Sequence, residues 1–108
     1  MAADLSGHAA LITGAASGIG RASAVAFSSA GASVALLDID ADGLADTAAA
    51  VREVGSRAEV LVADVSDLRA VTGAVGRAVE AFGRLDAALN NAGVPGFYVP
   101  LEIGRAHV

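Results

Sequence analysis

The chain has 108 residues, of which 55 % are hydrophobic and 18 % are charged, so we expect one folded domain rather than a disordered chain. Its net charge of −5 and its lack of a basic run argue against a nucleic acid or an anionic membrane as a partner. The absence of cysteine excludes disulfides, thiolate catalysis and cysteine-bound zinc. No signal-like segment opens the chain and no apolar run reaches membrane-spanning length, so we expect a cytoplasmic protein.

The first strong signal in chain order is a glycine-rich segment, TGAASGIG at residues 13–20, which follows an apolar run over residues 8–12. This order predicts a strand, a tight turn and the start of a helix. Gly14 and Gly18 can adopt backbone angles that a Cβ disfavours, and Gly20 permits close packing. The first N–H groups of the helix would then face a bound phosphate. An ordinary glycine-rich turn is the alternative in a chain with 13 glycines.

The rest of the chain alternates apolar runs with helical stripes of apolar residues, bounded by residues that begin and end helices. We expect helices over 19–30, from Asp40 or Asp42 to about Gly55, and from a cap at Ser66 to Gly83, and strands over 33–38, 59–64 and 85–90. Gly31 is expected to end the first helix. Strands that alternate with helices of this length form βαβ units with right-handed crossovers. The predicted fold class is therefore α/β, a doubly wound parallel sheet.

An acidic residue follows the second expected strand at the spacing typical of dinucleotide-binding folds. Asp38 lies 20 residues after Gly18, where its carboxylate would accept hydrogen bonds from both hydroxyls of an adenosine ribose. The same charge would repel a 2′-phosphate, and neither Ser17 nor Ile39 supplies a basic side chain. We therefore predict NAD as the cofactor and NADP as less favoured. A solvated carboxylate at a strand end is the alternative.

Two further motifs complete a pattern: Asp64 and Val65 follow the third expected strand, and an NNAG segment at residues 90–93 follows the fourth. Together with TGAASGIG and Asp38, these motifs occur in order over residues 5–93 and resemble the short-chain dehydrogenase/reductase family. The resemblance implies a Rossmann-type fold, incomplete here, with the order β-α-β-α-β-α-β along the chain. It also implies a strand order of 3-2-1-4, with two helices on one face of the sheet and the third on the other.

The resemblance also implies roles for single residues. The Asp64 carboxylate would accept a hydrogen bond from the adenine amino group beside Val65, and Ile19 would contact the pyrophosphate and nicotinamide side. The NNAG segment would lie along the cofactor and steady the central sheet. The expected cofactor-binding residues are Gly14, Ser17, Gly18, Ile19, Gly20, Asp38, Asp64, Val65, Asn90, Asn91, Ala92 and Gly93.

The catalytic residues of the family have no match in this sequence. Members transfer a hydride between nicotinamide and an alcohol or carbonyl, using a Tyr-x-x-x-Lys pair and a serine. Tyr98 is the only tyrosine, Glu102 stands four positions later, and all seven basic residues are arginine. Without a lysine to lower its pKa, Tyr98 is expected to be a loop or pocket-rim residue, and no catalytic residue is predicted. His8 and His107 lack partners at ligand spacing, so no metal site is predicted.

The resemblance covers only the cofactor-binding half of the family. We expect residues 1–101 to be this NAD-binding half, with the catalytic residues, substrate loop and assembly helices of the family downstream. Residues 102–108, EIGRAHV, resemble a translated sequencing adapter and are expected to be a non-native tail; a genuine short tail is the alternative. A fourth strand left as a bare edge predicts that the isolated product is marginally stable or insoluble.

Two functions remain open. The parent protein would be an NAD-dependent short-chain dehydrogenase, homo-oligomeric and acting on a small-molecule alcohol or carbonyl, of which this chain is an inactive half. Alternatively, the chain is a non-catalytic module that binds NAD or another adenine nucleotide. The missing Tyr-x-x-x-Lys pair favours the module for the chain as given, whereas the adapter-like tail favours the dehydrogenase for the gene. Neither hypothesis predicts a nucleic-acid or membrane partner.

Overall fold

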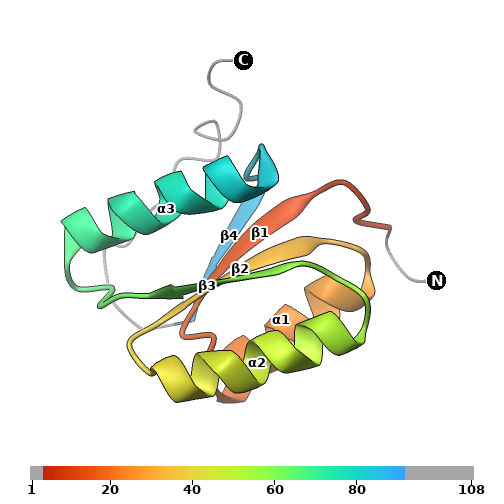
Figure 1. Ribbon diagram of the computed structural model, residues 1–108, viewed down its shortest axis with the longest axis horizontal. Helices are drawn as coiled ribbons and strands as arrows, with labels where there is room; N and C mark the ends of the chain where they lie inside the picture. The colour runs from red at the N-terminus through yellow and green to blue at the C-terminus, as the bar shows by residue number, and fades with distance from the viewer. Residues whose placement is uncertain (1–3, 92–108) are drawn as a thin grey trace.

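A computed structural model describes residues 4–91, which form a four-stranded parallel sheet and three helices (Figure 1). The elements are β1 (Ala9–Thr13), α1 (Gly18–Ser29), β2 (Ser33–Asp38), α2 (Ala41–Glu53), β3 (Ala58–Val62), α3 (Leu68–Phe82) and β4 (Ala87–Asn90). The strand order is β3-β2-β1-β4, and every pairing is parallel. The predicted α/β class and strand order are confirmed.

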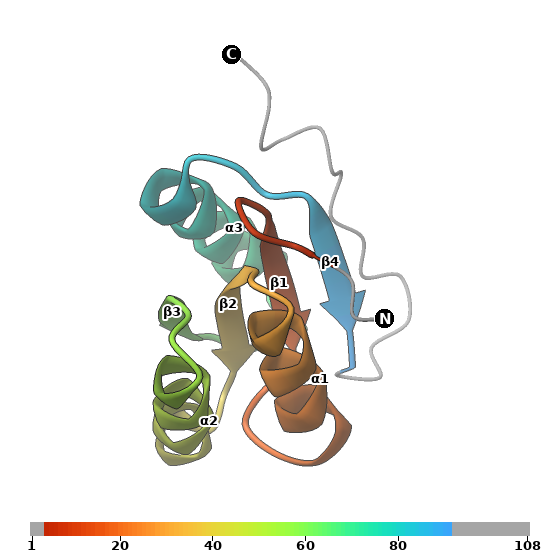
Figure 2. The same ribbon diagram turned by 90° about the vertical axis from the view of Figure 1, so that its right-hand side faces the viewer.

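The helices cover the two faces of the sheet unequally. Helices α1 and α2 lie side by side on one face, and α3 lies on the other, as Figures 1 and 2 both show. The division follows from the order of the strands. Right-handed crossovers that move along the sheet in one direction place their helices on one face, and a crossover that moves in the opposite direction places its helix on the other face. The direction reverses between β3 and β4, which lie at the two edges of the described sheet.

Each face of the sheet carries its own apolar core. Neighbouring residues of a strand point to opposite faces, so Leu11 and Leu37 join the core under α3, whereas Ile12 and Leu36 join the core under α1 and α2. All four of these side chains are fully buried. The short all-apolar runs predicted as strands are thus explained, because a parallel strand covered on both faces has no solvent side.

The register brings the carboxyl ends of the strands to one edge. Thr13 pairs with Leu37 on one side and with Asn90 on the other, and Asp38 pairs with Val62. The segments that follow the strands therefore leave the sheet next to one another. This edge is where an open parallel sheet binds its ligands.

Acidic side chains begin two of the helices, and one predicted cap is wrong. The Asp40 side chain accepts a hydrogen bond from the Gly43 N–H at the start of α2, which selects Asp40 over Asp42. Helix α3 begins after Asp67, whose carboxylate accepts from two backbone N–H groups, and not after Ser66. Ser66 instead donates its N–H and its hydroxyl to Asp64 in a local turn, so its side chain is already engaged.

The observed element bounds differ slightly from the predicted ones. The third strand ends at Val62, two residues early, because the chain turns at the Asp64 hydrogen bonds. The fourth begins at Ala87, and the first extends to Thr13. Gly31 and Gly83, expected at helix ends, both have positive φ there, which favours glycine. No helix within residues 4–91 combines the length and apolarity needed to cross a membrane.

Candidate functional site

The glycine-rich segment forms the turn between β1 and α1. Gly14 and Gly18 have φ values of 64° and 58°, a conformation that strains any residue with a Cβ. A Cβ on Gly20 would overlap the carbonyl oxygen of Gly14, so the absence of a side chain lets the first turn of α1 close over the loop. Ser17 is the N-cap residue of α1, but its side chain makes no capping hydrogen bond. No acidic side chain lies in that first turn, so nothing there offsets the positive end of the helix dipole.

Asp38 stands at the carboxyl end of β2 and connects that strand to the glycine loop. One carboxylate oxygen accepts from the Ala16 N–H at 3.0 Å. The other accepts from the N–H groups of Ile39 at 2.7 Å and Asp40 at 3.1 Å. The three bonds fix the carboxylate in place, and the side chain lines the pocket described below. Each carboxylate oxygen can accept more than one hydrogen bond, so the group retains capacity for a ligand hydroxyl.

Asp64 and Val65 follow β3 and border the same pocket. The Asp64 carboxylate accepts the Ser66 N–H at 2.9 Å and the Ser66 hydroxyl at 2.7 Å. The backbone bond from Ser66, assisted by the hydroxyl bond, holds the pKa of Asp64 below its ordinary value against the opposing effect of desolvation. The side chain therefore presents a carboxylate, an acceptor, at neutral pH.

The two asparagines after β4 have different surroundings. The Asn90 side-chain oxygen accepts from the Thr13 hydroxyl at 2.9 Å, which ties the ends of β4 and β1 together, and Asn90 does not line the pocket. The Asn91 N–H donates to the Thr13 hydroxyl oxygen at 3.0 Å, and its side chain lines the pocket. The Asn91 side-chain nitrogen is buried and has no hydrogen-bond partner among residues 4–91.

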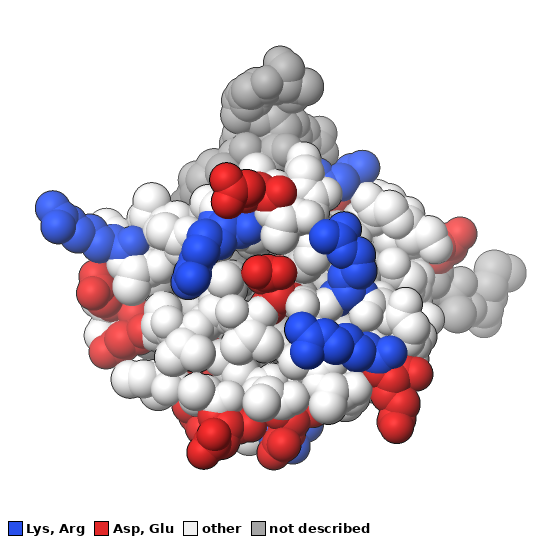
Figure 3. Space-filling model, viewed as in Figure 1, with Lys and Arg blue, Asp and Glu red and all other residues white. Residues whose placement is uncertain are grey.

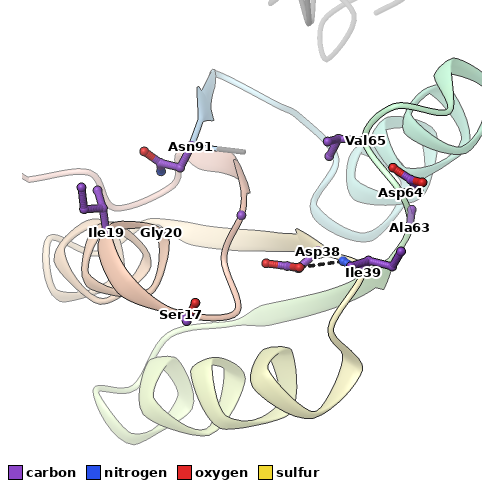
Figure 4. A pocket seen from close by; sticks show the side chains of 10 residues that line it. Ser17, Ile19, Gly20, Asp38, Ile39, Ala63, Asp64, Val65 and Asn91 are labelled. Atoms are coloured by element: carbon purple, nitrogen blue, oxygen red, sulfur yellow. Dashed lines mark hydrogen bonds between the residues drawn. The ribbon is translucent and has the colours of Figure 1, made fainter. Parts of the chain in front are cut away.

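These segments line a pocket that is open to solvent. Its volume is about 520 Å³, within the size range of small-molecule and cofactor sites. Figure 4 shows Ile19 and Asn91 at one end, Ala63, Asp64 and Val65 at the other, and Asp38 between them. The lining residues are Gly14, Ser17, Ile19, Gly20, Asp38, Ile39, Ala63, Asp64, Val65 and Asn91.

Most of the residues predicted to bind a cofactor therefore line one pocket. Gly18 and Asn90 do not line it, although each adjoins a residue that does. Ala92 and Gly93, and also Tyr98, His107 and the proposed tail, lie outside the described residues. Sequence reasoning did not assign Ile39 and Ala63 to the site. Their position next to the acidic residues at two strand ends was the available signal.

Among the described residues that line the pocket, the titratable side chains are the carboxylates of Asp38 and Asp64, without histidine or arginine. His8 is exposed just before β1, and residues 4–91 contain no group of three metal-ligating side chains. Acidic and basic side chains alternate over the face of the described residues seen in Figure 3, without a continuous basic surface.

Comparison with known protein sequences identifies relatives along nearly the whole chain. The family model for short chain dehydrogenases matches residues 8–106. Levodione reductase from Leifsonia aquatica is 48 % identical over 94 residues, which cover 85 % of this chain and 35 % of the reductase. The 3beta-hydroxysteroid dehydrogenase 2 of Eggerthella lenta is 40 % identical over 97 residues, covering 90 % of this chain and 37 % of that enzyme. The chain thus spans little more than a third of the length of these relatives.

Solved structures with the same arrangement include two that hold NAD. A short chain dehydrogenase from Mycobacterium paratuberculosis bound to NAD has a TM-score of 0.81 and 36 % identity, over 84 % of this chain and 38 % of that one. Carveol dehydrogenase from Mycobacterium avium in complex with NAD has a TM-score of 0.81 and 34 % identity, over 93 % of this chain and 40 % of that one. From its fold, its motifs and the family match over residues 8–106, the chain belongs to the short-chain dehydrogenase family.

Proposed function

We propose that this chain binds NAD across the carboxyl edge of its sheet, as the cofactor-binding part of an NAD-dependent oxidoreductase. The observation that carries the proposal is the convergence of the glycine loop, Asp38 and Asp64 on one pocket. The cofactor-binding unit spans residues 1–101. The whole enzyme, homo-oligomeric and cytoplasmic, would act on a small-molecule alcohol or carbonyl, and bound NAD would supply its hydride acceptor.

The residues in the pocket match the chemistry of a dinucleotide. Gly20 lets the first turn of α1 lie against the Gly14 carbonyl, and that turn offers backbone N–H groups and a positive dipole end to a pyrophosphate. Asp38 would accept the hydroxyls of the adenosine ribose, and Asp64 the adenine amino group. Asn91 lines the opposite end of the pocket, where it would lie along the cofactor, as the family resemblance implies.

Asp38 also supports a preference for NAD over NADP. A carboxylate held by three backbone N–H groups cannot easily swing away from the pocket, so a 2′-phosphate would meet its charge directly. Its neighbour in the pocket, Ile39, is apolar and 68 % exposed, and supplies no compensating cation. NADP would therefore bind more weakly than NAD.

Isothermal titration calorimetry with NAD and NADP tests this proposal. We expect NAD to bind more tightly, and Asp38→Ala to weaken NAD binding by about 10- to 100-fold, since hydrogen bonds to a charged group contribute about 1.5–3 kcal/mol. Asp38→Asn removes the charge but keeps a hydrogen-bond acceptor, so it should reduce the difference in affinity between NAD and NADP. Asp46→Ala, an exposed site on α2 outside the pocket, should change neither affinity. Tighter binding of NADP than of NAD by the unaltered chain would overturn the cofactor assignment.

A non-catalytic NAD-binding or adenine-nucleotide-binding module is the second candidate. It is favoured by the absence of lysine from the sequence and of any histidine, lysine or tyrosine from the described pocket lining. Sequencing the source DNA past the codon for Pro95 separates the two candidates. A serine followed by a Tyr-x-x-x-Lys pair in frame supports the dehydrogenase, and a stop codon directly after Val108 supports the module.

A further inference from the structure

Arg21, on the first turn of α1, donates hydrogen bonds to the glycine loop and to α2, and its partners lie outside the pocket. Its Nε donates to the Thr47 hydroxyl at 2.9 Å, and its Nη2 donates to the carbonyl oxygens of Ala16 and of Gly43, the latter at 3.2 Å. The guanidinium thus connects α1, the loop and α2 through partners that do not line the pocket. A planar group with several fixed donors suits such a junction better than an ammonium does.

Thr47, one turn after Gly43 on α2, completes the junction. Its side chain is fully buried, and its hydroxyl donates to the Ala15 carbonyl at 2.7 Å while accepting from Arg21. Two consecutive loop carbonyls therefore accept hydrogen bonds from the neighbouring helices, that of Ala15 from Thr47 of α2 and that of Ala16 from Arg21 of α1. These two carbonyl oxygens point to donors that do not line the pocket, so their partial negative charges would be directed away from an anion bound there.

Gly43 allows α2 to approach the loop closely enough for these bonds. A Cβ on Gly43 would lie 2.7 Å from the Ala16 Cβ and 2.8 Å from the Ala16 carbonyl oxygen. Any side chain at this position would push the first turn of α2 away from the loop and lengthen the bonds made by Arg21 and Thr47. This glycine stands outside the glycine-rich motif, and its requirement comes from helix-to-loop contact.

The backbone of the loop is held on its other side by β2. The Ala15 N–H donates to the Leu37 carbonyl at 3.3 Å, and the Ala16 N–H donates to Asp38 at 3.0 Å. Every backbone polar group of Ala15 and Ala16 is therefore bonded to a residue of α1, α2 or β2. A loop flanked by Gly14 and Gly18 would otherwise lose much conformational freedom when a ligand ordered it.

We infer that Arg21, Gly43 and Thr47, here called the loop clamp, hold the glycine loop in the conformation that receives the pyrophosphate of NAD. The inference rests on the proposed NAD binding and adds positioning residues that lie outside the pocket and outside the glycine motif. Pre-ordering of the loop lowers the entropy cost of binding, so the loop clamp contributes to affinity without touching the ligand.

The test compares NAD with adenosine, which lacks the pyrophosphate, on the 108-residue chain, using calorimetry for NAD and NMR titration for adenosine. We expect Arg21→Met to weaken NAD binding by about tenfold, equivalent to about 1.4 kcal/mol, with a much smaller change for adenosine. Arg57→Met is the matched control, because Arg57 also donates to a backbone carbonyl, that of Ala81 at 2.8 Å, and packs on Phe82 away from the pocket. It should leave both affinities unchanged.

A second pair of variants keeps the inference testable if Arg21→Met does not fold. Thr47→Val keeps the shape of the side chain but removes the hydroxyl, whereas Thr47→Ser keeps the hydroxyl and should restore tight NAD binding. Amide hydrogen exchange of Ala16 in the ligand-free protein should be faster in Thr47→Val than in Thr47→Ser. Circular dichroism melting shows which variants are folded.

The outcomes separate this inference from the proposed function. If the unaltered chain does not bind NAD, the proposed function fails. If the unaltered chain binds NAD and the folded Arg21 and Thr47 variants bind it equally well, the loop clamp is overturned while the proposed function stands. Equal losses for NAD and adenosine would also overturn it, because they would indicate general loosening of the fold.

Discussion

Gly20 is the residue at which the loop geometry is least tolerant of change. The space that a Cβ would need is taken by the carbonyl of Gly14 and the Cα of Ala15, which are backbone atoms and cannot rotate away. The glycine is therefore required by contact and not by its own φ angle, in contrast to Gly14 and Gly18. A larger residue would displace either the loop or the first turn of α1.

We predict that Gly20→Ala lowers the free energy of unfolding by about 1–3 kcal/mol, the usual cost of overpacking, and also weakens NAD binding. Urea denaturation and calorimetry measure the two effects. Gly76→Ala on α3 is the control, because nothing lies within 4 Å of its added Cβ. That variant should be more stable by about 0.5–1 kcal/mol, the helix cost of glycine. If Gly20→Ala changed neither stability nor NAD binding, the loop would be able to move enough to accommodate the added Cβ.

Asp38 combines two tasks at the residue scale. It anchors the glycine loop through the Ala16 N–H, and it lines the pocket where a ribose is proposed to bind. Replacing it therefore affects loop position and ligand contact together. Asp38→Asn is the more informative change for cofactor choice, because the amide oxygen can still accept from a loop N–H.

At the scale of elements, Asp86 joins the beginnings of β4 and β1. Its carboxylate accepts the Ala9 N–H at 2.8 Å and pairs with Arg84 at 2.6 Å, and its own N–H donates to the Ala9 carbonyl at 2.9 Å. The side chain is only 14 % exposed. Desolvation by burial would raise its pKa, but the bonds from Arg84 and Ala9 and the charges of Arg84 and His8 outweigh it, so the pKa is lowered from 3.8.

A lowered carboxyl pKa stabilises the fold above the pKa of the unfolded chain, and this contribution is lost as the pH falls through the folded pKa. We predict that Asp86→Asn lowers the free energy of unfolding by about 1 kcal/mol at neutral pH, the difference between hydrogen bonds to charged and neutral acceptors. The difference in free energy of unfolding between Asp86→Asn and the unaltered chain should disappear below about pH 4. Urea denaturation across this range measures it, with Asp46→Asn, exposed on α2, as the control. If the difference in free energy of unfolding did not change with pH, the negative charge of Asp86 would make no contribution to stability.

At the scale of the whole molecule, the two apolar cores share the central strands. Leu36 faces the core under α1 and α2, and its neighbour Leu37 faces the core under α3. Because β1 and β2 contribute to both cores, loss of packing on one face loosens the strands that support the other. We therefore expect the described region to unfold as one unit.

We predict that Leu36→Ala and Leu37→Ala each lower the free energy of unfolding by about 2–5 kcal/mol, the range for removal of a buried leucine. Each variant should still unfold in a single transition, with the same midpoint by circular dichroism and by fluorescence of a probe attached to α3. Leu68→Ala, at a side chain that is 75 % exposed, should change stability by no more than about 0.5 kcal/mol. Two separate transitions in either core variant would contradict the shared-strand description.

The carboxyl edge of the sheet depends on single residues, on the elements and on the whole fold. Its position follows from the parallel register, its shape from the glycine loop, and its charge from Asp38 and Asp64. The edge strands β3 and β4 flank it, and β4 pairs with β1 alone among the strands of residues 4–91. The expectation that an unpaired β4 edge makes the isolated product marginally stable remains a prediction.

Much of the fold and most of the pocket lining were predictable from local patterns. Apolar periodicity distinguishes strands from helices within about ten residues, and glycine and aspartate mark turns and strand ends. Asp38 was predicted as a site residue by its spacing from Gly18, because the length of one βαβ unit is nearly constant. The sequence by itself therefore determined the class of fold, the order of elements and the segments that meet at the site.

Only the tertiary structure decided which side chains face the pocket and which support it. The choice of Asp67 over Ser66 as a cap depends on the prior engagement of Ser66 by Asp64. The separate surroundings of Asn90 and Asn91 depend on Thr13, and the loop clamp joins Arg21 to Thr47 across 26 positions of sequence. These contacts are set by how elements pack against each other, and no periodic signal in the chain encodes a contact between residues so far apart.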